Sequence, residues 1–136
     1  MWYFKDVKII YTAEFVKDIS ELLKKFPPKH VKVFGHHSTI AFRPNDLTGI
    51  EIGKESKFKI IGRVSDEMGD VLIVENTRSE NKIPHITLSC AEGVVPKYSQ
   101  DLLEKAIQAG TVEYFQVPVE VEVIEGYFDG EKDVIS

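Results

Sequence analysis

The sequence has one cysteine, no long apolar run and no excess of basic residues. Because Cys90 is the single cysteine, no disulfide can form within the chain. No apolar segment approaches the roughly 20 residues that a membrane-spanning helix needs. The N-terminal residues lack the basic, apolar and small-residue order of a signal peptide. We therefore expect a cytoplasmic protein with no membrane partner.

Basic residues are outnumbered, with 17 Lys and Arg against 22 Asp and Glu and a formal net charge of −5. A protein that binds a long duplex neutralises many phosphates with Lys and Arg, so we expect no long nucleic acid as partner. A small anionic ligand held by a few local donors remains compatible. No Cys/His cluster has the spacing of metal ligands, so we expect no metal and no other cofactor.

The length of 136 residues and the hydrophobic content of 43% predict one domain, over residues 1–136, with a substantial core. Strand-like and helix-like apolar patterns alternate along the chain, which indicates an α+β fold. The polar tail 129–136 is expected to fray. The expected elements are a strand over 2–11, a helix from an N-cap at Thr12 through 15–26, a strand over 31–42 interrupted at Gly35, a hairpin over 57–64 and 71–75, a strand ending at Cys90, a helix from Pro96 to Gly110, and a strand over 117–123.

Two short segments repeat the pattern His-x-Thr-apolar: His37-Ser38-Thr39-Ile40 and His85-Ile86-Thr87-Leu88. At average composition, two such matches arise by chance on the order of one time in a hundred. Both segments are rich in β-branched residues and are predicted strands. Residues i and i+2 of a strand face the same way, so each histidine projects beside its threonine. The apolar residues point to the other face and can anchor each strand in a core.

Two such polar faces opposed across a cleft would supply two acid/base groups and two hydroxyl donors. Imidazole has a reference pKa of about 6.5 and can act as acid or base near neutral pH. The threonine hydroxyls would donate hydrogen bonds to non-bridging oxygens and offset charge as it develops. These groups suit metal-free cleavage of a phosphodiester. The sequence leaves open which histidine is the base and which the acid.

The paired motifs and the order of elements around them resemble the 2H phosphoesterase superfamily, which is named for two His-x-[Ser/Thr]-apolar motifs. Its members include RNA-ligase-like and cyclic phosphodiesterases that act on 2′,3′-cyclic phosphate ends, and phage proteins that degrade cyclic oligonucleotide signals. The resemblance implies catalytic roles for His37, Thr39, His85 and Thr87. Ser38 stands where the family often has an apolar residue, and the separation of 48 residues between the motif histidines is compact.

The expected order of elements is β-α-β, β-β, β-α-β, with one motif strand in each outer unit. This crude duplication suggests two sheet-and-helix lobes related by approximate two-fold symmetry around a central cleft. The resemblance implies the same two-lobed, 2H-phosphoesterase-like fold.

We expect the substrate to be a nucleotide, a cyclic (oligo)nucleotide or a short RNA end. Tyr11, at the end of the first expected strand, and Arg78 and Lys82, in the loop before the second motif, are candidate substrate-binding residues. Core packing is the alternative for Tyr11, and solvated charge is the alternative for the other two.

Two other functional interpretations stay open. The chain could be a non-catalytic module that binds a nucleotide or an RNA end in the same cleft, although all four motif side chains are present. It could also be a structural protein in which the two motifs lie far apart. His36 should face away from His37 on a regular strand, which favours a structural or supporting role, unless a bulge at Gly35 turns it.

Overall fold

A computed structural model describes residues 8–136 of the chain. The fold is α+β, as the sequence predicts. In chain order its elements are β1 (Tyr11–Val16), α1 (Ile19–Lys25), β2 (Lys32–Val33), β3 (His37–Phe42), β4 (Glu55–Ser65), β5 (Gly69–Val74), β6 (His85–Cys90), α2 (Tyr98–Ala109), β7 (Glu113–Phe128) and β8 (Asp133–Val134).

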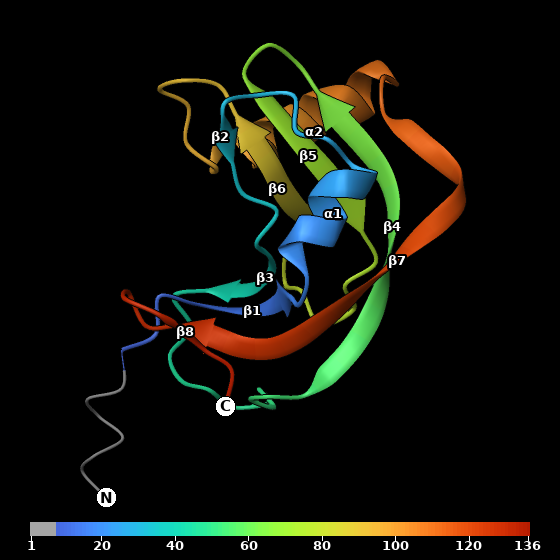
Figure 1. Cartoon of the computed structure of the whole chain (residues 1–136). Helices are drawn as coiled ribbons and strands as arrows, with labels where there is room; N and C mark the ends of the chain where they lie inside the picture. The colour runs from blue at the N-terminus through green and yellow to red at the C-terminus, as the bar shows by residue number, and fades with distance from the viewer. Residues whose placement is uncertain (1–7) are drawn as a thin grey trace, which may run out of the picture.

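All strands belong to one antiparallel sheet in the order β2-β6-β5-β4-β7-β1-β3, with β8 paired to β7. The sheet curls strongly, and the long strands β4 and β7 bend through the curl (Figure 1). The two end strands, β2 and β3, follow one another directly in the chain. The curl therefore has to bring the two ends of the sheet near each other.

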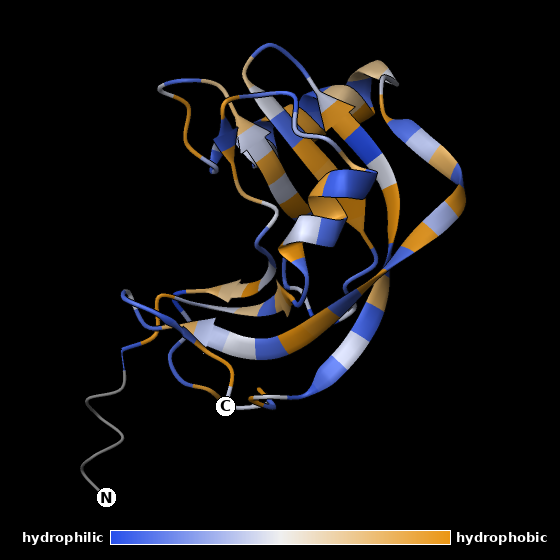
Figure 2. Cartoon of the chain, viewed as in Figure 1, coloured by the Kyte–Doolittle hydropathy of each residue, from blue (hydrophilic) through white to orange (hydrophobic). Residues whose placement is uncertain are grey.

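Two clusters of apolar side chains cover opposite faces of the β4–β5–β6 part of the sheet. Leu72 and Val74 of β5 pack in the cluster that contains Leu22 of α1. Their neighbours Val71 and Ile73 pack in the cluster formed with α2. Apolar and polar residues alternate along the bent strands β4 and β7, as the stripes in Figure 2 show. The helices thus lie on the two faces that the period of two assigns to successive residues.

The predicted N-terminal elements are partly wrong. Most of the expected strand over 2–11 lies outside the described residues, and Thr12 is not a helix N-cap but a buried residue of β1. Since β1 pairs with β3 on one side and β7 on the other, Phe15 lies in a central strand, although its apolar spacing also fits a helix. The helix begins later, where the side chain of Asp18 accepts a hydrogen bond of 3.0 Å from the backbone N–H of Glu21.

The C-terminal half is closer to the prediction, with one exception. The second helix ends at Gly110, which adopts the left-handed conformation with φ of 68°. The tail does not fray. Asp129 accepts hydrogen bonds from the N–H groups of Glu131 and Lys132, and the resulting turn folds β8 back onto β7.

The inner face of β1 and β7 carries a buried pair of carboxyl groups, Glu14 and Glu125. Burial opposes charge on Glu125, but its hydrogen bonds with Arg78, Glu14 and the Glu51 N–H together outweigh that effect and lower its pKa to about 2. Burial and the hydrogen bond with Glu125 raise the pKa of Glu14 to about 8. At neutral pH the pair therefore holds one proton, on Glu14.

Glu14→Gln should make folding stability less dependent on pH. The folded-state pKa of Glu14 lies above its ordinary value of 4.5. The protonated side chain of Glu14 therefore contributes fully to folding stability below pH 4.5, and this contribution is lost as the pH rises through about 8. A permanently neutral Gln should therefore make the protein more stable than wild type at pH 9. Urea unfolding between pH 5 and 9 measures this, with the exposed Glu113→Gln as the matched control. A stability curve for Glu14→Gln parallel to that of wild type would contradict the assignment.

Candidate active site

The two motif strands meet where the chain crosses from one end of the sheet to the other. The backbone N–H of Phe34 donates to the Leu88 carbonyl at 2.9 Å, and the N–H of Gly35 donates to the Thr87 carbonyl at 3.0 Å. One residue later, the His36 carbonyl accepts a hydrogen bond of 2.9 Å from the N–H of Val16 in β1. The segment 34–36 thus leaves β6 and joins β1, and it places the start of β3 beside β6.

The four motif side chains lie on one face of the sheet. Thr87 and His85 are register partners of Val71 and Ile73, which pack with α2, while Ile86 and Leu88 pack with α1. His37 pairs in register with Phe15, whose neighbour Val16 belongs to the α1 cluster. Both histidines and both threonines are half-buried, and the burial patterns of β3 and β6 agree over their first five residues. The matched strand phase that the sequence predicts is therefore present.

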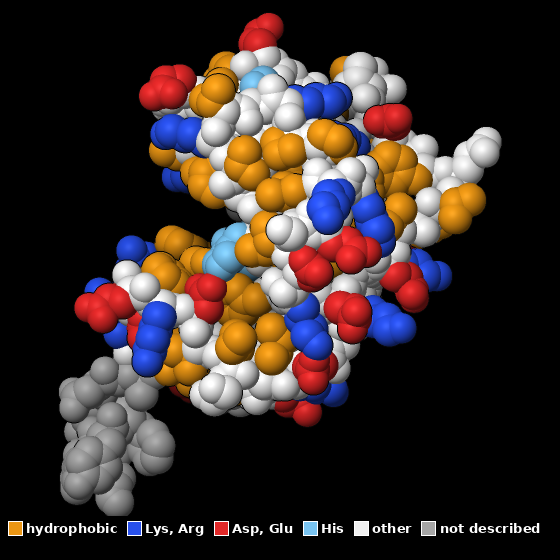
Figure 3. Space-filling model, in the orientation of Figure 1, with side chains coloured by type: hydrophobic (Ala, Val, Ile, Leu, Met, Phe, Trp, Pro, Cys, Tyr) orange, Lys and Arg blue, Asp and Glu red, His pale blue; other side chains and the backbone are white. Residues whose placement is uncertain are grey.

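A recess separates the two ends of the curled sheet, and histidine side chains gather at its inner end (Figure 3). The charge of His85 is one of the influences on the pKa of His37, so the two imidazoles lie within electrostatic reach of each other. The structure therefore brings the two motifs together, unlike the interpretation in which they lie far apart.

His37 is held among aromatic and imidazole rings. The Tyr11 ring stacks on it at 4.5 Å between centroids and 16° between planes. The Tyr11 hydroxyl lies 3.5 Å from His37 Nδ1, and His36 Nδ1 lies 2.9 Å from the same atom. Burial, followed by the charges of His36 and His85, lowers the pKa of His37 to about 3. His37 is therefore neutral at pH 7 in the ligand-free protein.

His85 and Thr87 have different partners from their counterparts in β3. His85 Nδ1 lies 2.8 Å from the backbone carbonyl of Ile83, and Thr87 Oγ1 lies 2.8 Å from Ser99 Oγ in the first turn of α2. Burial lowers the pKa of His85, and the Ile83 carbonyl acts against that effect because it favours the charged ring. Within residues 8–136, neither His37 Nε2 nor His85 Nε2 has a hydrogen-bond partner.

The loop between β5 and β6, which leads into the second motif, is hydrogen-bonded to β3. Ser79 Oγ donates to the Thr39 carbonyl at 2.8 Å, and the N–H of Glu80 donates to the Ile40 carbonyl at 2.7 Å. Ser38, on the other face of β3, is fully buried and accepts a hydrogen bond of 3.1 Å from Asn76 Nδ2. The buried hydroxyl of Ser38 is thus satisfied by this loop.

The structure places the three candidate substrate-binding residues differently. Tyr11 lies against His37. Arg78 instead binds Glu125 and the carbonyl of Gly49 on the opposite face of the sheet, so it is not brought to the histidines. Lys82 is exposed on the loop three residues before His85.

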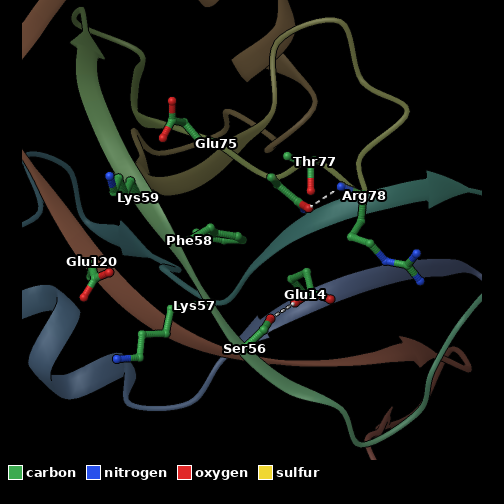
Figure 4. Close-up of a pocket in the computed structure, with 10 residues that line it drawn as sticks. Glu14, Ser56, Lys57, Phe58, Lys59, Glu75, Thr77, Arg78 and Glu120 are labelled. Carbon is green, nitrogen blue, oxygen red and sulfur yellow. Dashed lines mark hydrogen bonds between the residues drawn. The ribbon is translucent and has the colours of Figure 1, made fainter.

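Arg78 lines a cavity of about 410 Å³ on that opposite face (Figure 4). Glu14 and Ser56 meet on one side of it, and the Arg78 side chain points away from the other residues drawn. Glu14 holds a proton at neutral pH and Arg78 is paired with Glu125, so the remaining two basic and two acidic side chains of the lining give no preference for an anion. The ionisable lining residues are Lys57, Lys59, Arg78, Glu14, Glu75 and Glu120.

Sequence reasoning missed two residues at the site and placed a third differently. Asp133 lies 2.6 Å from His36 Nε2, although its segment was expected to fray. The Asp129-Gly130 pair, a strong signal for a hairpin turn, could have predicted that β8 returns to β7. Ser99 gave no signal, because only the packing of α2 brings it to Thr87. His36 points to the same side as His37 rather than away from it.

No protein-family model matches the chain, and comparison with curated proteins finds no match. No helix within residues 8–136 is long and apolar enough to cross a membrane. In the same part of the chain, no group of three or more His, Cys, Asp or Glu side chains is placed to hold a metal ion. A functional assignment therefore depends on the geometry of the paired motifs.

His37 should stay neutral far below the ordinary histidine pKa in the ligand-free protein. The folded-state pKa of His37, about 3, lies below the ordinary value of 6.5. As the pH drops, the unfolded chain therefore binds a proton at this residue before the folded protein does. Folding stability should fall between pH 6.5 and pH 3 for this reason. NMR titration of ¹⁵N-labelled histidine measures the pKa directly, and His37→Gln should reduce the loss of stability. Titration of His37 at 6.5 or above would show that its burial has no such effect.

Proposed function

We propose that this protein is a metal-independent phosphodiesterase of the 2H type, which acts on 2′,3′-cyclic phosphate RNA ends or on small cyclic (oligo)nucleotides. The observation that carries the proposal is the crossing at Gly35, whose N–H binds the carbonyl of Thr87 and sets the two His-x-Thr strands side by side in the same phase. A histidine that only packs in the core would need neither a second His-x-Thr motif nor a face shared with it.

The proposed chemistry uses each motif side chain in a defined role. One imidazole takes a proton from the attacking oxygen and the other delivers a proton to the leaving oxygen. The hydroxyls of Thr39 and Thr87 donate to the non-bridging phosphate oxygens, where charge increases in the transition state. An anionic phosphate between the imidazoles favours the charged form of one of them, so the neutral state of the empty site is compatible with acid catalysis.

The finer architecture is part of this proposal. Each motif strand lies at or next to an end of the sheet, α1 precedes β3 in the chain, and α2 follows β6. These relations support a two-lobed, approximately two-fold arrangement of the 2H type. Because β4 and β7 run through both halves of the curl, the lobes would share one sheet rather than form two separate ones.

An aromatic wall next to His37 supports a nucleotide substrate. Tyr11 stacks on Phe128 at 5.3 Å between ring centroids, and its register partner in β3 is Phe42, which projects from the same face. Phe42 is 66% exposed, and the guanidinium of Arg43 lies 5.3 Å from its ring centroid. An exposed ring beside a guanidinium can stack a base and bind the adjoining phosphate. A net charge of −5 agrees with a short substrate rather than a long one.

The proposal is tested by assaying the purified protein, with EDTA present, on a panel of 2′,3′-cyclic nucleotides, cyclic-phosphate-ended RNA and cyclic di- and trinucleotides. We expect turnover of at least one class, a bell-shaped pH–rate profile and no loss on chelation. Activity that is lost with EDTA and restored by a divalent ion would contradict the mechanism. Saturable binding of these ligands without any turnover would instead establish the non-catalytic module.

Variants separate catalytic from structural roles in that assay. His37→Ala and His85→Ala should each lower turnover by about 10²- to 10⁴-fold, the usual contribution of a general acid or base. Thr39→Val should cost less, at most the roughly 2.7–4 kcal/mol of a lost oxyanion donor. Leu88→Ala should act through stability, by about 2–5 kcal/mol for an emptied core position. His30→Ala is the matched control, since that ring binds the Asp66 carbonyl in another part of the molecule.

Phe42→Ala should discriminate between short and long substrates. Phe42 lies five residues beyond His37 on β3, at most about 17 Å away at 3.3 Å per residue, so we expect its ring to stack the base of a second nucleotide and not of the one at the histidines. The KM for an oligonucleotide should rise about 10-fold, within the 1–3 kcal/mol of one stacked base, while the KM for a cyclic mononucleotide stays unchanged. Val117→Ala, another exposed apolar residue, is the control. Equal effects on both substrates would remove Phe42 from the base subsite.

A further inference from the structure

A chain of three polar side chains ends at His37. Asp133 Oδ2 in β8 lies 2.6 Å from Nε2 of His36, and Nδ1 of His36 lies 2.9 Å from Nδ1 of His37. The two imidazole rings are nearly perpendicular, at 87° with centroids 5.0 Å apart. The edge of the His36 ring thus meets the edge of the His37 ring, with nitrogen facing nitrogen.

The chemistry of these atoms decides where the protons lie. A carboxylate only accepts hydrogen bonds, so Asp133 requires His36 to donate through Nε2–H. As long as His36 carries this one proton and no second, its Nδ1 is bare and can only accept, so His37 must donate to it through Nδ1–H. The Nε2 atom of His37 is left with a free lone pair. That tautomer is the one that can take a proton from an attacking oxygen.

We propose that Asp133 and His36 fix the tautomer of His37 and thereby make it the general base, with His85 as the general acid; this inference rests on the proposed function. Asp133 and His36 are positioning residues, because they act through His37. The acid role of His85 follows from its own partner. Burial lowers the pKa of His85 in the empty site, but the Ile83 carbonyl accepts from its Nδ1–H and opposes that effect, so a proton gained when phosphate binds lies on Nε2, from which it can be delivered.

The reaction balances with these roles. The water oxygen bonds to phosphorus as His37 Nε2 takes one of its protons. The bond between phosphorus and the leaving ester oxygen breaks, and that oxygen receives the proton from Nε2 of His85. The products are a phosphomonoester and a hydroxyl, which share one ribose when the substrate is a cyclic phosphate. Solvent then removes the proton from His37 and returns one to His85.

Two backbone features build the chain of contacts. Gly35 adopts φ of 67°, a left-handed conformation that costs little only for glycine, and this turn allows the consecutive rings of His36 and His37 to share one side of the sheet. Gly126 of β7 leaves space for β8, since a Cβ there would overlap the carbonyl oxygen of Val134. The close approach of β8 carries Asp133 to His36.

The titratable groups that face the two rings come from three elements. Tyr11 of β1 and His85 of β6 face His37, and Asp133 of β8 faces His36 as well as influencing Tyr11. Burial raises the pKa of Tyr11, so its phenol stays neutral throughout the working range. Among these groups, Asp133 is the one carboxyl group.

¹⁵N NMR of the labelled full chain tests the tautomer without any need for turnover. Wild type should show His37 protonated at Nδ1 and bare at Nε2, and Asp133→Asn should give a mixture of both tautomers, because an amide can also donate to His36. The matched control is Glu131→Gln, an exposed acid on the same β7–β8 hairpin that should leave the spectrum unchanged. A wild-type His37 protonated at Nε2, or an Asp133→Asn spectrum like that of the control, would overturn the proposal.

The same samples test the division of roles with inorganic phosphate as the probe. On binding, the additional proton should be found on His85, while His37 keeps a bare Nε2. A proton taken up by His37 instead would reverse the assignment. In the assay, Asp133→Asn should lower kcat about 10- to 100-fold, the range usual for groups that orient a functional histidine, with KM and melting temperature as in Glu131→Gln.

The proposed function and the positioning role of Asp133 can be told apart by experiment. If neither histidine responds to phosphate and no panel substrate is turned over, the proposed function is wrong. If the enzyme is active but the kcat and the His37 tautomer are indifferent to Asp133, the function stands and the positioning role is wrong. Asp133→Glu should restore part of the kcat, since a carboxylate is again available to accept from His36.

Discussion

The hydrogen bond from Gly35 to the carbonyl of Thr87 is the contact on which the arrangement of the site depends. It is made at the point where the chain leaves one end of the sheet and joins the other, with a left-handed backbone that only glycine adopts at little cost. A Cβ at this position would come within 3.2 Å of Leu23 and 3.4 Å of Leu22, so the core under α1 also leaves little space for a side chain here. The curl of the sheet and the pairing of the motifs therefore have a common origin.

The two faces of the sheet carry different chemistry. The inner face buries the α1 cluster and the proton-sharing pair Glu14 and Glu125, which Arg78 partly neutralises. The outer face carries the motif histidines and threonines. Successive side chains of a strand point to opposite faces. Ser38 of β3 can therefore bind Asn76 on the inner face while its neighbours His37 and Thr39 lie on the outer face. The cavity lined by Arg78 and the recess with the histidines are thus separate features.

Two motifs with the same sequence pattern acquire different properties from their surroundings. His37 is enclosed by Tyr11, Phe15 and a second imidazole, whereas His85 meets a backbone carbonyl. Thr87 has a hydroxyl partner in Ser99, while Thr39 is anchored through its backbone carbonyl by Ser79. The acid/base pair that we propose needs two groups whose environments differ. Here the difference comes from β8 and from the loop before β6, which lie far from each other in the sequence.

The sequence by itself determined the α+β class, the motif strands with their shared phase, the break at Gly35 and the second helix with its end at Gly110. These features are set by local periodicity and by single residues with special backbone preferences, which can be read along the chain. It did not determine β1, because the apolar spacing of Tyr11–Val16 fits either a helix or a central strand and only pairing with β3 and β7 decides between them. The place of Arg78 on the inner face, the orientation of His36 and the contact of Asp133 with it were decided by tertiary structure alone. Each depends on which strands become neighbours, and that is a property of the closed sheet, not of any one segment.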